Sequence, residues 1–188
     1  FRSPGVVVKV VDPETGEGPL FGREGLLLVN GPNRMSGYLG DNALTQDVMR
    51  DGWYVTGDIA SVDDAGFITI TDRLSRFSKI GGEMVPHIRI EEEIDKLVGP
   101  SADGKPQVAV TAVPDEKKGE RLIVLHTKLE KSPEELCKGL SSAGLPNLYI
   151  PGADSFLEVA ELPILGTGKL DLRGIKAMAL EKVASTPP

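Results

Sequence analysis

The stretch "GWYVTGDIASVDDAGFITITDR", residues 52–73, contains the pattern that decides the fold of the first part of this chain. Val62 enters the turn sequence "DDAG", and Phe67 to Ile70 continue on its far side with aromatic and β-branched side chains. Such side chains favour strands, and a short polar turn that ends in glycine favours the reversal between two of them. We therefore expect an antiparallel hairpin here.

Two further strand patterns precede this hairpin. The stretch "GVVVKVVD" is β-branched and runs into the turn cluster "PETGEGP", and "EGLLLVNGPN" repeats the arrangement. Apolar runs bounded by glycine, proline and asparagine are typical of short strands. The sequence therefore predicts a small β-rich unit up to about residue 71.

The pattern changes after this unit, because helical and strand patterns then alternate. Ile90, Ile94, Leu97 and Val98 have helical spacing, and Gly99 ends the run. Further on we expect strands in "QVAVTAV", "RLIVLHTKL" and "SFLEVAELP", with the loop "PDEKKGE" between the first two, and helices in "SPEELCKGLSSAG" and "DLRGIKAMALEKVA". The predicted fold class is α+β, with a small β-rich subdomain followed by a small α/β domain.

The composition is typical of a soluble globular protein. Of 188 residues, 40% are hydrophobic and 26% are charged, which suits one ordinary domain or two small ones. The formal charge of -7 disfavours nucleic acid as a main partner, because nucleic acids require a cationic surface. An anionic small molecule held by a few local cations is still compatible with this charge.

The sequence contains no visible targeting or membrane segment. Its longest apolar run is far short of the roughly 20 residues that a membrane helix requires. The start "FRSPGVVVKV" has neither a charged leader nor an initiating methionine, so we expect the chain to be a piece of a longer protein. The single cysteine, Cys137, excludes an intrachain disulfide and fits a reducing, cytoplasmic location.

The stretch "LPILGTGKLD", residues 162–171, suggests a phosphate-binding loop at first sight. A Walker loop, however, has glycine five positions before the glycine that precedes its lysine and a hydroxyl residue after that lysine. Here those positions are Pro163 and Leu170, so the Walker interpretation fails. What remains is a flexible turn that presents the ammonium group of Lys169, either to developing negative charge or simply to solvent.

Four stretches, in order, resemble the motifs of one family. They are "NGPNRMSGYLG", "GWYVTGDIA", "GFITITDRLSRFSKIGGEMVP" and "LPILGTGKLD". Together they resemble the last signature motifs of the adenylate-forming, AMP-binding enzymes, which comprise acyl-CoA synthetases, peptide-synthetase adenylation domains and luciferases. Within the family, "RFSKIGGEMVP" and "LPILGTGKLD" are most similar to the acyl-acyl carrier protein synthetase part of the bifunctional 2-acylglycerophosphoethanolamine acyltransferase, and an acyl-CoA synthetase is the alternative.

The resemblance covers essentially the whole chain but only the back end of the family's enzyme. It implies that residues 1–71 form the last β-rich subdomain of the large N-terminal adenylation domain. Residues 72–76 would form a hinge, and residues 77–188 the mobile C-terminal domain. The front portion, with its phosphate-contacting loop and acyl pocket, would lie outside this chain, so the chain alone is expected to be inactive.

The resemblance assigns three residues to nucleotide binding. Asp58 would accept hydrogen bonds from the ribose hydroxyls, because an ionised carboxylate is an acceptor for two adjacent donors. Its structural alternative is an aspartate that caps its own turn after Gly57. Arg73 would make a cationic contact to the ribose or phosphate region, or else only pair with Asp72 or a neighbouring carboxylate. Tyr54 would line the nucleotide site, or would simply be a strand aromatic that packs in the core.

Two further residues are implied in catalysis and movement. Lys169 would contact the substrate carboxylate and the α-phosphate and offset the negative charge that builds up there, which makes it the catalytic residue. Arg76 stands where the family usually has its hinge residue, commonly an aspartate or a lysine, so this chain departs from the pattern. A hinge depends on backbone torsions more than on side-chain identity, and the departure therefore affects the position of the pivot and not the movement itself.

The segment "SKIGGEMVP" is implied in a channel for the thiol-bearing pantetheine arm. Gly81 and Gly82 lack side chains, so their backbone can lie against a narrow ligand, and Lys79 would approach the same region. The alternatives are a glycine pair that makes a tight bend between a strand and a helix, and an ordinary solvated lysine. No metal site is expected, since His87 and His126 lack cysteines or carboxylates at ligand spacing. Cys137 falls in a helical pattern and is predicted to be a small buried hydrophobe.

The implied reaction of the whole enzyme has two steps. A fatty acid reacts with ATP to give an acyl-adenylate, and a thiol then displaces AMP to form a thioester. The cofactors implied are ATP, Mg²⁺ bound mainly outside this chain, and CoA or phosphopantetheine, and the small domain would turn between the steps. The partner is CoA or an acyl carrier protein, and an acidic carrier would suit the basic residues Lys117, Lys118 and Arg121.

Two broader readings remain beside this one. The parent could also contain an acyltransferase, act in phospholipid metabolism and attach to the inner membrane, as the closer resemblance implies. Alternatively, the fragment is a non-catalytic module that docks carriers or regulates a partner. A nucleotide titration separates these classes.

Overall fold

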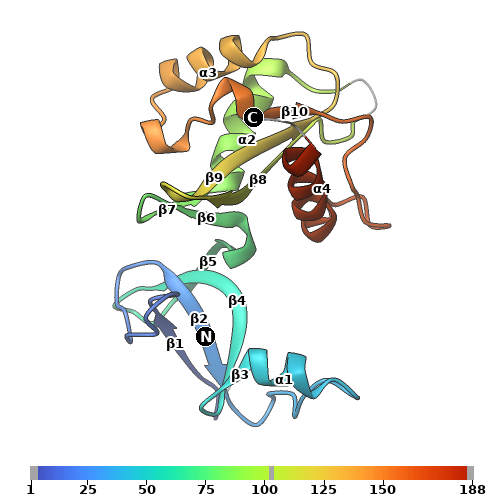
Figure 1. The fold of residues 1–188 in the computed structure, drawn as a ribbon. Coiled ribbons are helices and arrows are strands. Elements are labelled where there is room, and N and C mark those ends of the chain that lie inside the picture. The colour runs from blue at the N-terminus through green and yellow to red at the C-terminus, as the bar shows by residue number, and fades with distance from the viewer. Residues whose placement is uncertain (1–3, 102–103, 186–188) are drawn as a thin grey trace. The chain divides into compact units, whose positions relative to one another are not determined.

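The computed structural model describes residues 4–101 and 104–185, and in it the chain forms two compact units, residues 1–74 and 75–188 (Figure 1). The division falls inside the segment 72–76, which the sequence predicted as a hinge. Each unit has its own sheet and its own apolar core. The α+β class predicted from the sequence is confirmed.

The first unit is built on an antiparallel five-stranded sheet. Its strands are β1 (Val7–Val11), β2 (Gly25–Asn30), β3 (Met49–Arg50), β4 (Trp53–Val62) and β5 (Ile68–Arg73), with the helix α1 (Asn42–Val48) before β3. The order is β1-β2-β4-β3, and β5 also pairs with β4. The predicted hairpin is therefore confirmed, with Val62 opposite Ile68 at its closed end.

Alternation along these strands gives the sheet an apolar cluster on each face. Val10 and Leu27 pack with Ala60 on one face, and Val11 and Leu26 pack with Trp53 on the other. Successive side chains of a strand point to opposite faces, so apolar residues at neighbouring positions serve both clusters. The second cluster also includes Leu74, the last residue of this unit.

The second unit is a mixed sheet with helices on both faces. In chain order it contains β6 (Phe77–Ile80), β7 (Glu83–Pro86), α2 (His87–Val98), β8 (Val108–Asp115), β9 (Gly119–His126), α3 (Pro133–Ser142), β10 (Phe156–Glu158) and α4 (Leu172–Ser185). The strand order is β10-β9-β6-β7, and β8 also pairs with β9. All pairs are antiparallel except β9 with β10.

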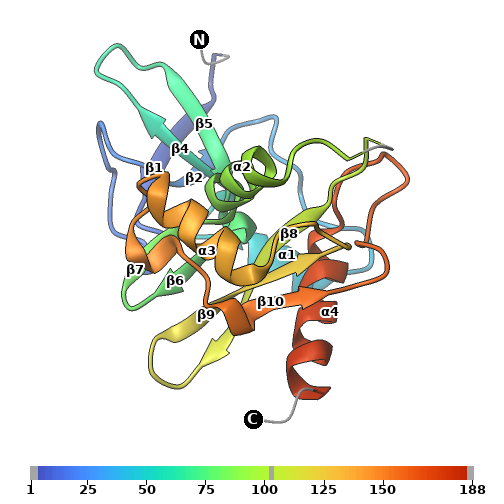
Figure 2. The ribbon, with the colours of Figure 1, turned by 90° about the horizontal axis from the view of Figure 1, so that it is seen from above.

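The central pair β8 and β9 is buried on both faces. Val110 and Val124 face the cluster formed with α2 and α3, whereas Ile123 and Leu125 face the cluster formed with α4. Figure 1 and Figure 2 show α2 and α3 on one face of this sheet and α4 on the other. This arrangement explains why the two strand sequences are continuously apolar and not alternating.

The boundaries of the second unit follow from local capping. Ser132 caps α3 by accepting the N–H of Glu135, while the Glu135 side chain accepts the N–H of Ser132, which completes a capping box. Gly99 ends α2 in a left-handed conformation, with φ of 79°. The predicted loop 114–120 is shorter than expected, because Asp115 accepts the N–H groups of Lys117 and Lys118 and closes a tight turn.

Candidate functional site

Asp58 and Arg73 lie opposite each other on the neighbouring strands β4 and β5. Arg73 Nε lies 2.9 Å from Asp58 Oδ1, and the side chains are 62% and 19% exposed. Arg73 Nη1 also donates to the carbonyl of Thr56 at 3.2 Å, and the Thr56 hydroxyl accepts the N–H of Asp58 at 3.0 Å. The second carboxylate oxygen of Asp58 has no hydrogen-bond or ion-pair partner in residues 4–101 and 104–185, so it is available to a ligand.

The bend of β4 at Gly57 orients the side chain of Asp58. The register between β2 and β4 shifts between Leu26 and Leu28, and Gly57 there has a φ of 74°, a left-handed value that favours glycine. Thr56 stabilises the bend because its hydroxyl donates to the carbonyl of Leu27 at 2.8 Å. The sequence "TGD" therefore forms a bulge whose carboxylate faces Arg73 on the next strand.

Tyr54 lies four positions before Asp58 on β4 and is partly buried. Burial raises the pKa of its phenol, and the charge and hydrogen bond of Tyr38 raise it further, while Arg73 opposes the shift. Tyr38 was missed by the sequence reasoning, although it stands in the quoted stretch "NGPNRMSGYLG". Spacing alone offered no signal for it, since 16 positions separate the two tyrosines along the chain.

Lys169 follows the tip of a closed turn between β10 and α4. Ile164 and Leu170 form an antiparallel bridge, the N–H of Leu165 donates to the Lys169 carbonyl at 2.7 Å, and the N–H of Gly168 donates to the Leu165 carbonyl at 2.8 Å. Gly168 has a φ of 82°, which explains the need for glycine there. The expected flexible turn is thus a hydrogen-bonded one, and it presents an exposed ammonium group that has no partner among the described residues.

A cavity of about 960 Å³ lies beside this turn, within the second unit. It is lined by residues of β6, α2, β8, the turn and α4, which are Ser75, Phe77, Ser78, His87, Thr111, Leu165, Leu170, Asp171, Leu172, Arg173, Lys176, Ala177 and Leu180. The Ser78 hydroxyl and His87 Nε2 are hydrogen-bonded at 2.6 Å. Burial, assisted by the charges of Arg76 and Lys176, lowers the pKa of His87 to about 3, so the imidazole is neutral and only weakly basic near pH 7.

Gly81 and Gly82 form the two-residue turn between β6 and β7. Their φ angles are 60° and 93°, and Ile80 pairs with Glu83 across the turn. Two left-handed residues in a two-residue hairpin explain both glycines by conformation alone. The turn joins two strands, and not a strand and a helix as the alternative reading had it. Open space surrounds Gly82, where an added Cβ would meet no atom within 4 Å.

This glycine turn adjoins the basic turn between β8 and β9. The N–H of Gly81 donates to the carbonyl of Lys118 at 2.9 Å, and the N–H of Lys79 donates to Glu120 Oε2 at 2.8 Å. The predicted channel residues and two of the three basic residues, Lys118 and its neighbour Lys117, therefore lie together. Both lysines are exposed at the turn.

Arg76, the predicted hinge residue, is buried and only 9% exposed. Its guanidinium forms an ion pair with Glu91 of α2, and Glu91 Oε1 accepts the N–H of Val110 of β8 at 2.7 Å. Burial raises the pKa of Glu91, while Arg76 and the Val110 N–H act in the opposite direction. The residue that the family pattern places at the pivot is therefore bound to the core of the second unit.

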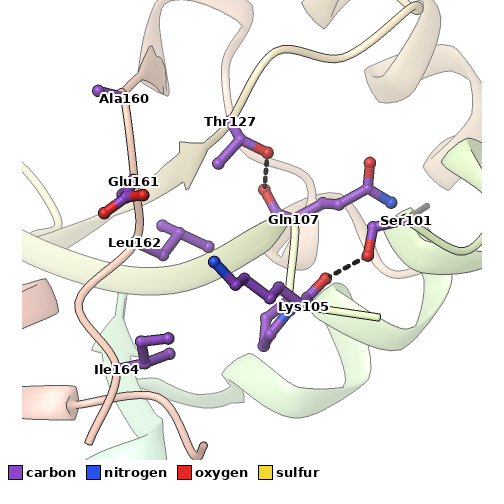
Figure 3. A pocket seen from close by; sticks show the side chains of 9 residues that line it. Ser101, Lys105, Gln107, Thr127, Ala160, Glu161, Leu162 and Ile164 are labelled. Carbon is purple, nitrogen blue, oxygen red and sulfur yellow. Dashed lines mark hydrogen bonds between the residues drawn. The ribbon is translucent and has the colours of Figure 1, made fainter. Parts of the chain in front are cut away.

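A second, smaller cavity of about 290 Å³ lies where the segment 160–164 passes the end of β9. Figure 3 shows its lining, in which Lys105 extends toward Leu162, the Ser101 hydroxyl donates to the Lys105 carbonyl at 2.7 Å, and Gln107 lies beside Thr127. The cavity is near the lower limit for a small-molecule site and has no concentration of one charge. It contains none of the residues that the sequence assigned to a site.

Other candidate chemistry in the described part of the chain is limited. No group of three or more histidine, cysteine or acidic side chains there is placed to hold a metal ion. Cys137 lies in α3 with its thiol donating to the Pro151 carbonyl at 3.2 Å, and it is partly exposed and not fully buried as predicted. Burial raises the pKa of this thiol, which disfavours a nucleophilic thiolate. No helix within the described residues is long and apolar enough to cross a membrane.

Comparison with known proteins gives relatives over most of the chain. It is 33% identical over 166 residues to a feruloyl-CoA synthase of Amycolatopsis sp, covering 87% of this chain and 32% of the relative. It is 34% identical over 180 residues to a long-chain-fatty-acid–CoA ligase of Thermus thermophilus, covering 92% of this chain and 31% of the relative. No protein-family model matches the chain.

Solved structures give the same result. The crystal structure of ATP-bound MatB from Rhodopseudomonas palustris matches 97% of this chain and 35% of its own length, with a TM-score of 0.71 and 28% identity. The chain thus spans about a third of the length of the proteins that it matches. From its motifs, its fold and these relatives, the chain belongs to the adenylate-forming enzymes and corresponds to their C-terminal portion.

Proposed function

We propose that this chain is part of an ATP-dependent acid–thiol ligase, which converts a carboxylic acid to an acyl-adenylate and then to a thioester. The observation that carries the proposal is the similarity of 92% of the chain to a protein named as a long-chain-fatty-acid–CoA ligase. A fatty acid is accordingly the substrate class that we propose. ATP is proposed as the activating cofactor, and the match to an ATP-bound enzyme supports it.

In the first unit, Asp58 and Arg73 are proposed to bind the ribose of the nucleotide, with Tyr54 at the edge of the site. The ion pair with Arg73 supports this role, since it fixes one oxygen of the Asp58 carboxylate while leaving the other without a described partner. The two carboxylate oxygens of Asp58 can together accept hydrogen bonds from the adjacent 2′- and 3′-hydroxyl groups of a ribose. Arg73 is exposed enough to reach a phosphate or a ribose oxygen as well.

In the second unit, Lys169 is proposed as the catalytic residue of adenylation. Its ammonium group would offset the negative charge that develops as pyrophosphate leaves the α-phosphate. Two features support this role, namely an exposed ammonium without a described partner and a hydrogen-bonded turn that fixes its backbone. The described residues do not offer a Mg²⁺ site, so we derive no step through the metal.

We place the pivot between the two units at Ser75 and not at Arg76. Leu74 packs into the apolar cluster of the first unit, whereas Arg76 is bound by Glu91 in the second. Ser75 lies between these anchors and is exposed. Removing Arg76 from Glu91 would leave a buried charge unpaired, which typically costs about 3–5 kcal/mol, so rotation at Ser75 is the less costly route.

The acceptor that we propose is CoA, because the relatives are named as CoA ligases. The exposed turns that hold Gly81, Gly82 and Lys118 adjoin, and they suit a narrow thiol arm that carries phosphate groups. An acyl carrier protein is the second candidate, since it is acidic and would suit the same basic turn. Lys79 and Arg121 are near enough in sequence to these turns to contribute to either mode of docking.

The experiment compares the purified chain with the enzyme that contains it. With ATP, Mg²⁺, a fatty acid and CoA, we expect the containing enzyme to form acyl-CoA and the isolated chain to form none. The same assay with acyl carrier protein in place of CoA distinguishes the two acceptors. Absence of ATP-dependent adenylate formation by the containing enzyme, with any acid tried, would favour the interaction-module reading and overturn the ligase.

A further inference from the structure

The hairpin of β6 and β7, which carries the glycine turn at its tip, is attached to the rest of its sheet at a narrow junction. All of β6 pairs with β7. Among the described residues, its pairing with β9 consists of Ile80 opposite Gly119. The N–H of Gly81, which donates to the Lys118 carbonyl at 2.9 Å, extends this junction into the turn. The place of the glycine turn on the second unit therefore depends on few contacts.

A side chain of β9 supplies a further contact where the two strands separate. The N–H of Lys79 donates to Glu120 Oε2 at 2.8 Å. In a regular antiparallel ladder a backbone carbonyl would accept such an N–H, and a backbone N–H always requires an acceptor. The Glu120 carboxylate thus replaces a ladder carbonyl and fixes the backbone two positions before Gly81.

The other oxygen of Glu120 is also engaged within the second unit. Oε1 lies 3.6 Å from Nζ of Lys176 on α4, and both side chains are partly exposed. Ion pairs of this exposure contribute little to stability, so we assign the holding of the hairpin to the bond from Lys79. That bond is charge-assisted and therefore stronger than a bond between neutral groups.

The position of this turn matters if a ligand passes over it. Gly81 and Gly82 are exposed, and an added Cβ at Gly82 would meet no atom within 4 Å. A bare backbone offers a narrow ligand only its own surface, so the place of that backbone sets the path of the ligand. A misplacement of about 1 Å can cost about 10²-fold in rate.

We propose that Glu120 is a positioning residue of the thiol step, which holds the turn of Gly81 and Gly82 in place by binding the N–H of Lys79. This inference rests on the role proposed above for that turn in accepting a thiol arm. Glu120 acts through the hairpin and not by contact with the thiol. The requirement is for an oxygen at the correct reach, and the negative charge is secondary.

The first test measures this contact without any substrate. In the 188-residue chain, hydrogen exchange of the Lys79 amide reports whether its N–H is bonded. Glu120→Gln keeps an oxygen at the same reach but no charge, whereas Glu120→Asp keeps the charge on a shorter side chain. We expect Glu120→Asp to speed this exchange by about 10-fold and Glu120→Gln by about 3-fold at most.

Exchange in β8 and β9 shows whether each variant is folded, and Glu116→Ala, at an exposed position of the same turn, is the matched control. Unchanged Lys79 exchange in Glu120→Asp would overturn the inference. Faster exchange in Glu120→Gln but not in Glu120→Asp would assign the effect to charge, and would overturn it as well.

The second test uses the containing enzyme with supplied acyl-adenylate and CoA. Glu120→Asp should lower kcat/KM for CoA by about 10-fold, mainly through KM, because the turn that guides the arm is displaced. Adenylate formation should be unchanged, and Glu120→Gln should retain most of the thioester formation. An equal loss in both half-reactions would indicate a general structural role and overturn the inference.

Gly82→Asn separates the inference from the proposed function. Asparagine tolerates a left-handed backbone and places a side chain in the open space beside the turn. If Gly82→Asn impairs thioester formation and Glu120→Asp does not, the inference fails while the proposed role of the turn stands. If Gly82→Asn has no effect although Lys79 exchange responds to Glu120→Asp, the proposed role of the turn fails, and the inference fails with it.

Discussion

The guanidinium of Arg76 is buried against the carboxylate of Glu91, and the two side chains are 11% and 12% exposed. Glu91 in turn binds the N–H of Val110, so a residue at the boundary between the units is fastened to both α2 and β8. Arg76 Nε has no hydrogen-bond partner among the described atoms. The ion pair itself therefore adds little net stability to the second unit. Loss of either side chain, however, would leave the other charge buried without a partner, which is strongly destabilising.

Arg76→Met should destabilise the second unit by about 3–5 kcal/mol, because Glu91 is then buried without its partner. Adding Glu91→Leu should recover only part of the loss, since the Val110 N–H would still lack an acceptor, at about 1–3 kcal/mol. Amide exchange in β8 and β9 measures the second unit. The fluorescence of the single tryptophan, Trp53, reports the first unit as an internal control and should be unchanged. A fully additive double variant would contradict the pairing.

Ser75→Pro should stop the complete reaction of the containing enzyme while one half-reaction continues. Proline holds φ near −65°, a value that the short 3₁₀ turn 74–76 also uses, so it restricts this pivot without excluding the turn. Ser75→Ala, which leaves the backbone free, should retain turnover and serves as the control. Adenylate formation and thioester formation are measured separately. Normal turnover by the proline variant would place the pivot elsewhere.

Lys169→Ala should reduce adenylate formation by about 10²–10³-fold, the typical effect of removing one preorganised electrostatic partner. Thioester formation from supplied acyl-adenylate should be retained, because no charge then develops on pyrophosphate. Lys138→Ala, on the exposed side of α3, is a control for the loss of one lysine elsewhere in the second unit. An equal loss in both half-reactions would argue against the assigned role.

Asp58→Asn should weaken AMP binding by about 10- to 100-fold, as expected for losing a charge-assisted hydrogen bond. Arg73→Lys should have a smaller effect, because the cation remains while the contacts to Asp58 and the Thr56 carbonyl lose their geometry. Asp63→Asn, in the turn between β4 and β5, is the matched control. The exposed partner limits the stability cost of either change to roughly 1 kcal/mol. Unaltered AMP binding by Asp58→Asn would remove this residue from the site.

His87 should make the second unit less stable in mild acid. The folded state binds its proton only near the pKa of about 3, whereas the unfolded state binds it near the ordinary value of 6.5. The unfolded state therefore holds more protons between these values, and stability falls as the pH drops through this window. Between pH 7 and pH 5 the expected loss is about 2 kcal/mol.

Two variants test this assignment by urea unfolding at both pH values, followed through the amide signals of the second unit. His87→Gln should remove most of the loss, because glutamine keeps a polar partner for Ser78 but does not titrate. Lys176→Gln is the control: it removes the smallest of the contributions that lower the pKa of His87, and because this pKa stays well below 5, the loss between pH 7 and pH 5 should be nearly unchanged. The same pH dependence in all three proteins would contradict the assignment.

The elements that the sequence predicted correctly are those with a strong local pattern. The β4–β5 hairpin follows from two strand patterns and one turn, and α2 follows from four apolar positions and Gly99. By contrast, α1 was missed because none of its seven residues is buried, so it has no apolar stripe. The predicted strand at "SFLEVAELP" is only three residues long, because Val159 is the last residue whose N–H reaches β9, at the carbonyl of His126.

The residues of the candidate site divide in the same way. Asp58, Arg73, Lys169 and the glycine pair were found from motifs that are continuous in sequence. The partners that define their surroundings were not, since Tyr38 is 16 positions from Tyr54 and Glu91 is 15 from Arg76. Local patterns set strands, turns and the conformations that require glycine, because these depend on a few neighbouring torsions. Only the tertiary structure decided that Arg76 is buried against Glu91 and that the glycine turn 81–82 adjoins the basic turn at Lys118, because each depends on which distant segments pack together and exclude water.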